Sequence, residues 1–312
     1  MTTETASRII LPDIAPSAFE HPMDRTALEA LRKTPGLDLL FKKLASLGFE
    51  RQVRLFFTAD SLRLSPRQCP RIYELFREAA DVLDMPEPEL YLLQNPIPNA
   101  FASGMDRFTI VVTSGLVDLL DDDELRAVLG HELGHIKSGH MLYRTMAYFL
   151  ALVGLVAARN LPFVNMLSQA LIYAFYDWFR KSELTADRAG LLVAQNPDVS
   201  ISTLLKLAGG THRDMGPLST EEFVKQADDY EDMDSSVLNM FYKFELTRFQ
   251  THPFPALRAR EIDRWALGPD YRKILTGEYT KVKSAAERRC PNCSVVIDNP
   301  TFAFCPDCGA GL

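Results

Sequence analysis

Basic residues are not in excess in this chain of 312 residues, which carries 34 Lys and Arg, 41 Asp and Glu and a formal net charge of −7. A nucleic-acid-binding surface needs clustered positive charge to neutralise phosphates, so we expect no nucleic-acid partner. The N-terminus also lacks the basic start and apolar core of a secretory signal, because Met1 to Arg8 is mostly polar. The sequence therefore predicts a cytoplasmic protein.

Long apolar stretches are also few. The charge-free windows Thr145–Ala158 and Asn160–Tyr176 hold 14 and 17 residues, at or below the roughly 17 to 25 residues of a spanning helix. Together the windows predict an apolar helical hairpin over residues 143–178. This hairpin is expected to be buried, to pair with a second copy of the chain as a homo-oligomer, or to make peripheral contact with a membrane, where Trp178 suits the interface. The alternative is a hairpin that spans the membrane.

Cysteine is scarce, and four of the five cysteines form two CxxC pairs, Cys290 with Cys293 and Cys305 with Cys308. In a chain without a secretory signal, this spacing favours a structural zinc ribbon over disulfides. Four thiolates complete the coordination of zinc and leave no position for water. The ribbon is predicted to occupy residues 288–312, and metal binding would supply its folding energy.

One local motif indicates chemistry: His131-Glu132-Leu133-Gly134-His135. Two imidazoles four residues apart meet on one face of a helix and can bind a single zinc ion, while Glu132 lies beside the open position of the metal. The motif falls in a helix predicted from about Asp122 to His140. Gly130 and Gly134 each cost a helix about 1 kcal/mol relative to Ala, which implies a close approach by a substrate or a neighbouring helix.

A catalytic zinc normally takes a third protein ligand, and Glu183 is the candidate. Glu183 and Asp187 are four residues apart and share a helix face, so one carboxylate could reach the metal while the other accepts the free ring N–H of a ligating histidine. The alternative is that both are surface charges that pair with Arg180, Lys181 or Arg188. His140 lies five residues after His135 and is predicted to pack or cap near the helix end.

Short strands are predicted at Glu89–Leu93, Ala100–Ala102 and Phe108–Val112, before the motif helix. The fold class expected is mainly α with a small antiparallel β-sheet, an α+β core of the zinc-metalloprotease type, followed by the zinc ribbon. We expect an N-terminal helical extension over residues 1–70, in which no motif indicates catalysis, and a peptidase domain over residues 71–280.

The segments HELGHIKSGH and SELTAD resemble the HtpX heat-shock protease and type-1 CAAX prenyl protease family of zinc metallopeptidases. Pro98-Asn99-Ala100-Phe101-Ala102 is similar to the Asn-Ala-Phe edge strand of that family. Thr251-His252-Pro253 with Arg258 is similar to its late His-Pro segment. The resemblance spans about Tyr91 to Arg260, the larger part of the chain.

This resemblance implies specific roles for the matching residues, which are listed here: His131, His135 and Glu183 as zinc ligands, Glu132 as general base, Asp187 as the partner of a ligating histidine, and Asn99, Ala100 and Phe101 as the strand that pairs with substrate. His252 is expected either to stabilise the oxyanion of the reaction or to be an ordinary turn residue. Membrane members of the family carry apolar helices before the motif, and this chain shows none there.

These observations predict a zinc-dependent endopeptidase with one catalytic and one structural zinc. Its expected substrates are proteins or peptides, and the family resemblance indicates protein quality control, including that of membrane proteins. The alternative is an inactive, chaperone-like peptide-binding protein that uses the ribbon as an interaction module. The intact Glu132 favours the enzyme, because a pure scaffold needs no base beside its metal.

Overall fold

The computed structural model describes residues 8–33, 49–105, 107–147, 162–209, 218–233, 254–282, 290–293, 295, 305 and 308–312. The helices are η1 (Pro16–Ala18), α1 (Pro22–Arg32), α3 (Phe49–Asp60), α4 (Pro70–Val82), α5 (Ser114–Leu119), α6 (Asp122–Lys137), α8 (Pro162–Ala194), α9 (Pro197–Gly209), α10 (Thr220–Asp232), α12 (Pro255–Leu267) and α13 (Pro269–Leu275). The strands are β1 (Leu62–Arg63), β2 (Glu89–Leu93), β3 (Ala100–Ser103) and β4 (Thr109–Thr113). The predicted fold class, mainly helical with a small sheet, is confirmed.

The four strands form one sheet in the order β1-β2-β4-β3. The three predicted strands are confirmed, but the prediction of an antiparallel sheet is wrong, because β2 and β4 are parallel while β3 pairs antiparallel with β4. All five residues of β4 are buried, which suits the central position, and the shorter β3 takes the edge. The sheet is therefore mixed.

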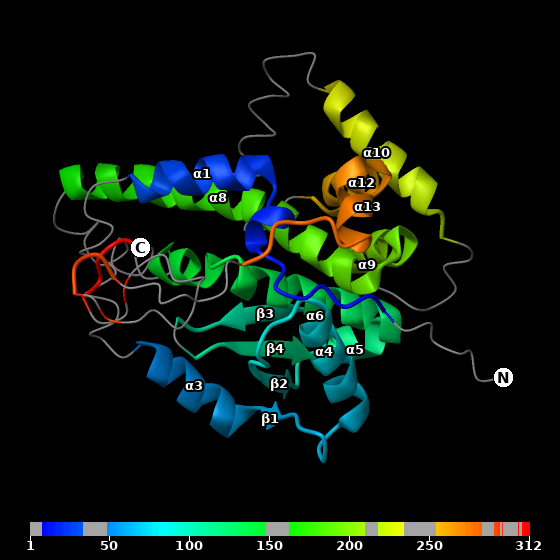
Figure 1. Cartoon of the computed structure of the whole chain (residues 1–312), viewed down its shortest axis with the longest axis horizontal. Coiled ribbons are helices and arrows are strands. Elements are labelled where there is room, and N and C mark those ends of the chain that lie inside the picture. Colours follow the sequence, from blue (N-terminus) through cyan, green and yellow to red (C-terminus); the bar gives the residue numbers. More distant parts are fainter. Residues whose placement is uncertain are drawn as a thin grey trace.

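The two faces of the sheet pack against different helices. Ile110 and Val112 of β4 belong to the main hydrophobic core, whereas Val111 between them packs with Phe57 of α3 and Tyr91 of β2. This alternation is the expected geometry of a strand covered on both faces. Helix α3 accordingly lies on the side of the sheet away from α8, and α6 lies between the sheet and α8 (Figure 1).

Helix α6 begins with a complete capping box, in which Asp121 accepts a hydrogen bond from the Glu124 N–H and the Glu124 side chain accepts one from the Asp121 N–H. The helix ends at Lys137, so the predicted extent to His140 is wrong. Gly139 adopts a positive φ of 71°, which ends the helix, and a new helix covers residues 140–147. The turn therefore separates α6 from this second helix directly after the motif.

Helix α8 packs on α6 more closely than ordinary side chains would allow. A Cβ atom placed on Gly130 would lie 2.6 Å from Cβ of Val193, and one placed on Gly134 would lie 2.5 Å from Cβ of Ala189. The predicted close approach at these two glycines is thus made by a neighbouring helix. Because α8 is continuous from Pro162 to Ala194, this contact also determines where Glu183 and Asp187 lie.

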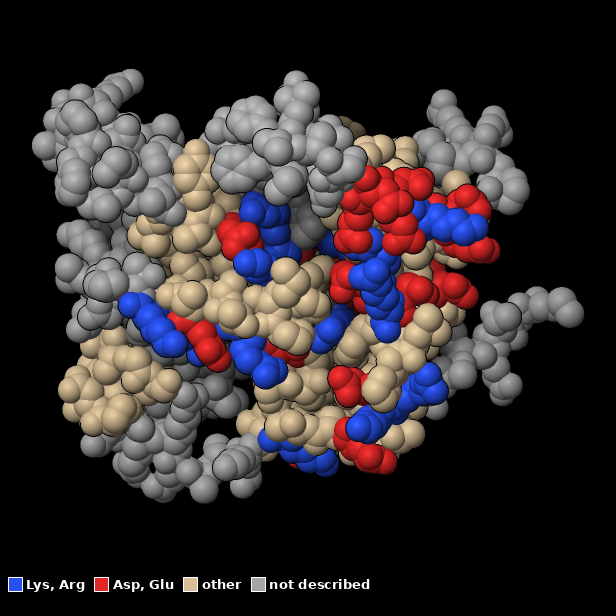
Figure 2. All heavy atoms as spheres, turned by 90° about the horizontal axis from the view of Figure 1, so that it is seen from above, with Lys and Arg blue, Asp and Glu red and all other residues tan. Residues whose placement is uncertain are grey.

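The N-terminal segment packs on the rest of the chain. Leu11, Ile14 and Phe19 belong to the main hydrophobic core. Helix α1 lies along α8 (Figure 1), and Leu28 of α1 packs in a second cluster with Trp178 of α8. Seen from above, the surface carries Lys and Arg interspersed with Asp and Glu, and acidic side chains gather toward the side of α10 (Figure 2).

The predicted apolar hairpin is described in part. Residues 140–147 and α8 are helical, and the predicted turn at residues 159–162 lies mostly outside the described residues. Among the helices of the described residues, none is long and apolar enough to cross a membrane.

We predict that Gly134→Ala lowers the free energy of unfolding by about 1 kcal/mol. Overpacking costs about 1–3 kcal/mol and exceeds the gain in helix propensity of about 1 kcal/mol, because the nearest atom is the rigid Cβ of Ala189. Urea unfolding measures the change. The companion Ala189→Gly should recover stability in the double variant; a Gly134→Ala protein more stable than the parent would contradict the close contact.

Candidate active site

Helices α6 and α8 bring the predicted site residues together. His131 and His135 lie one turn apart on α6, with ring centroids 4.8 Å apart and planes nearly perpendicular at 87°. Glu183 approaches from α8, with His131 Nε2 at 3.3 Å from Oε2 and His135 Nε2 at 3.1 Å from Oε1. The ligand atoms of the three residues all lie within 4.8 Å of one another. The surface-charge alternative for Glu183 does not hold, because this residue is buried.

The buried atoms at this point suit a metal cation. Nε2 of His135 is fully buried, and no described residue gives it a hydrogen bond, since its contact with Glu183 lacks hydrogen-bond geometry. Burial lowers the pKa of His135 well below its usual value, which keeps the imidazole neutral with a lone pair to offer. Two imidazoles and a carboxylate are donors that zinc prefers. The residues present therefore fit the metal that the motif implies.

His131 is oriented by a buried carboxylate. Its Nδ1 lies 3.0 Å from Oδ1 of Asp187, and Arg258 of α12 donates to both oxygens of that carboxylate at 2.8 and 2.6 Å. Burial raises the pKa of Asp187, but the charge and hydrogen bonds of Arg258 outweigh burial and lower it. Asp187 thus remains anionic and accepts a hydrogen bond from His131, which directs Nε2 toward Glu183.

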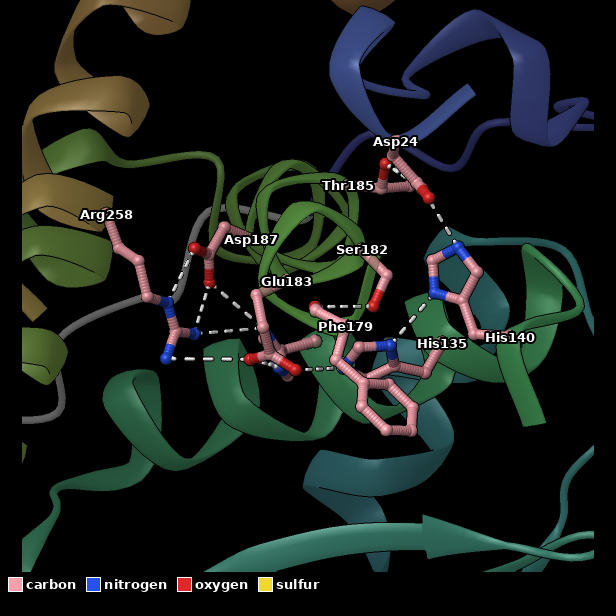
Figure 3. A network of polar contacts seen from close by, with 10 residues as sticks. Asp24, His135, His140, Phe179, Ser182, Glu183, Thr185, Asp187 and Arg258 are labelled. Carbon is pink, nitrogen blue, oxygen red and sulfur yellow. Dashed lines mark hydrogen bonds and ion pairs between the residues drawn. The ribbon is translucent and has the colours of Figure 1, made fainter. Parts of the chain in front are cut away.

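The same carboxylates favour positive charge at His131. Burial disfavours the charged imidazole, but hydrogen bonds to Asp187 and Glu183 outweigh it and raise the pKa of His131 to about 9. A pocket that holds a proton this strongly will also hold a cation that replaces the proton. Arg258 supplies some of the compensating charge, with Nη1 at 3.6 Å from Oε2 of Glu183 (Figure 3).

A cavity of about 210 Å³ opens beside these residues. Its wall includes His131, Glu132, Asp187 and Arg258, together with apolar side chains from α6 and α9 such as Val128 and Leu204. Oε2 of Glu132 is buried, and no described residue hydrogen-bonds to it. Glu132 therefore places an unpartnered carboxylate oxygen next to the three candidate ligands.

The edge strand β3 borders this cavity. Asn99 and Ala100 line it, while Phe101 belongs to the other face of the sheet, where its ring lies 5.6 Å from the ring of Phe57. Within β3, Ala100 and Phe101 point to opposite faces as successive strand residues do, so the three predicted residues do not all face the site. His252, the remaining predicted residue of this site, lies outside the described residues.

The four paired cysteines converge at the C-terminal end. Sγ of Cys290 lies 3.5 Å from Sγ of Cys308, and Sγ of Cys293 lies 3.5 Å from Sγ of Cys305. None of them forms a disulfide, and their sulfur atoms lie within 4.8 Å of one another. The cluster is consistent with a zinc-ribbon module.

Site and fold together define a metalloprotease, with an HExxH helix, a buried glutamate on a second helix and a bordering edge strand. The sequence matches Peptidase family M48 over residues 66–266, more than half of the chain, and the chain belongs to that family. The predicted HtpX-like membership is thereby confirmed.

Named relatives agree with this assignment. The chain is 38% identical over 271 residues to "Plastoglobule-localized metallopeptidase 48, chloroplastic" of Arabidopsis thaliana, an alignment that covers 86% of this chain and 77% of the relative. It is 30% identical to a "Protease HtpX homolog" of Moorella thermoacetica, over 51% of this chain and 62% of that protein. A "Protease HtpX homolog" of Sulfurihydrogenibium is 28% identical over 73% of this chain and 84% of the relative.

We predict that Arg258→Met destabilises the protein by about 3 kcal/mol, because it leaves Asp187 buried without its cationic partner. Urea unfolding of metal-free protein measures this. Arg264→Met on the same helix is the control, since Arg264 makes an exposed pair with Glu261 at 3.1 Å, and its removal should cost less than about 1 kcal/mol. Equal losses in the two variants would contradict the charge balance described here.

Proposed function

We propose that this chain is a zinc-dependent endopeptidase that hydrolyses peptide bonds of protein substrates. The observation that carries the proposal is the convergence of His131, His135 and Glu183 beside a cavity that Glu132 lines. His131, His135 and Glu183 would hold the catalytic zinc, and the four-cysteine cluster would hold a structural one. Membership of Peptidase family M48 supports the same reading.

When bound, zinc supplies Lewis acidity, which polarises the scissile carbonyl and acidifies water. Glu132 acts as the general base that takes a proton from the attacking water, and then returns that proton to the leaving amine. The unpartnered Oε2 of Glu132 is suited to this, because no other described residue competes for its lone pairs. Asp187 acts on His131 by holding its orientation.

The substrate would bind as an extended chain along the free edge of β3. Backbone hydrogen bonds to such an edge give affinity with little sequence preference. Asn99 and Ala100 line the cavity, so a peptide paired with β3 would pass in front of Glu132. Apolar side chains such as Val128 and Leu204 border the same space and would receive an uncharged side chain of the substrate.

The cellular role that we propose is protein quality control at a membrane surface. The relatives named as HtpX homologs and the relative named as plastoglobule-localized support this role. The apolar region of residues 143–178 would supply the membrane contact or a homo-oligomer interface.

Glu132→Gln is expected to retain zinc and to lose about 10²–10⁴-fold in hydrolysis, because only the proton-transfer group is removed. Cleavage of casein and metal analysis of the same sample measure the two quantities. Glu221→Gln, at an exposed position on α10, is the control and should cleave normally.

His135→Ala should lose zinc as well as activity. Full hydrolysis by Glu132→Gln would refute the mechanism, and a zinc-loaded parent that cleaves nothing would favour the chaperone-like alternative.

The parent chain is expected to bind about two zinc ions, one of them at the four cysteines. Cys290→Ser combined with Cys305→Ser should remove one zinc and leave the other, as measured by elemental analysis after gel filtration. Cys69→Ser is the matched control, because Cys69 lies apart from the cluster at the start of α4. An unchanged zinc content in the double variant would contradict the ribbon site.

A further inference from the structure

A line of buried polar contacts leads from His135 away from the cavity. Nδ1 of His135 lies 2.9 Å from Nδ1 of His140, and Nε2 of His140 lies 3.0 Å from Oδ2 of Asp24. All three side chains have 0% exposure. Figure 3 shows this line running from the metal-binding candidates to the N-terminal helix α1.

Two local features place these residues. The turn at Gly139 ends α6, and His140, the first residue of the next helix, brings its ring against that of His135. Helix α1 packs on α8, and there Asp24 accepts hydrogen bonds from Thr185 Oγ1 at 2.6 Å and from Trp178 Nε1 at 2.9 Å. The Asp24 carboxylate is thus held at both oxygens.

The hydrogen bonds determine where the protons lie. Thr185 and Trp178 donate hydrogen bonds to the Asp24 carboxylate, and Nε2 of His140 faces the same carboxylate, so Asp24 acts as a hydrogen-bond acceptor. His140 therefore donates from Nε2. With its Nε2 proton directed at Asp24, His140 accepts at Nδ1, and His135 donates from its own Nδ1. The remaining nitrogen of His135, Nε2, is left with a lone pair that points toward Glu183.

We propose that Asp24 and His140 are positioning residues that hold His135 in the tautomer and orientation required to bind the catalytic zinc. This inference rests on the proposed function and extends it to the N-terminal segment. Each histidine of the motif is then oriented by a carboxylate. Asp187 contacts His131 directly, and Asp24 acts on His135 through His140.

A purely structural role accounts poorly for Asp24. A fully buried carboxylate loses several kcal/mol of hydration. Trp178, which donates to Asp24, belongs to an apolar cluster, and an apolar residue in place of Asp24 would avoid that loss of hydration. Asp24 also lies before residues 66–266, which match the family. The metal centre therefore extends beyond the segment that carries the motif.

The test compares zinc affinity in the full chain. Asp24→Asn should raise the zinc dissociation constant of the catalytic site about 10- to 100-fold, as loss of such outer hydrogen bonds does elsewhere. Chelator competition measures this, and the Glu183→Gln chain gives the contribution of the ribbon alone. Leu28→Ala is the matched control, because it weakens the packing of α1 on α8 without touching the relay. Its affinity should stay within about 2-fold of the parent.

Equal affinities of Asp24→Asn and the parent would overturn the proposal, as would an equal loss in Leu28→Ala. A second readout needs no variant and remains decisive if Asp24→Asn does not fold. In ¹⁵N spectra of the histidine side chains of the zinc-loaded parent, His135 should carry its proton on Nδ1 and His140 on Nε2 only. A proton on Nδ1 of His140 would also overturn the relay. Absence of zinc from the His/Glu site of the parent would instead overturn the proposed function.

Discussion

The approach of α6 and α8 leaves no room for side chains at Gly130 and Gly134 on α6, or at Gly190 on α8, where a Cβ atom would lie 2.9 Å from the carbonyl oxygen of Ala127. Glycine lowers the stability of a helix, but here it lets the backbones of α6 and α8 approach each other. Because the helices are close, the carboxylate of Glu183 on α8 reaches both His131 and His135 on α6. The geometry of the site is thus a property of backbone separation as much as of the ligand residues.

Charge balance is the second constraint on the site. Glu132, Glu183 and Asp187 are buried within one region, and Arg258 is the principal buried cation against them among the described residues. Carboxylates in a low-dielectric interior repel one another, and burial penalises each of them. A divalent cation relieves both costs. The composition of the pocket therefore selects for metal independently of the motif.

Local sequence patterns predicted the residues of the site better than they predicted the strand order and the contacts between distant segments. His131, Glu132 and His135 follow from helical spacing, and so does the pairing of Glu183 with Asp187, because each relation spans one turn. The strands were equally recognisable. The mixed order of the sheet was not, since β2 pairs with β4 rather than with β3, the strand that follows it in the sequence. Asp24 was missed for the same reason: nothing near it in the sequence indicates that His140, 116 positions later, lies beside it.

Sequence separation also governs when the site can form. Arg258 neutralises Asp187 at a distance of 71 positions along the chain, and it leaves the ribosome long after both motif histidines. Domains fold as units during synthesis once enough chain has emerged. A nascent chain that ends before α12 holds Asp187 and Glu183 without their guanidinium partner, and its pocket is incomplete. Under the proposed function, hydrolytic capacity would arise only after α12 has emerged and packed on α8.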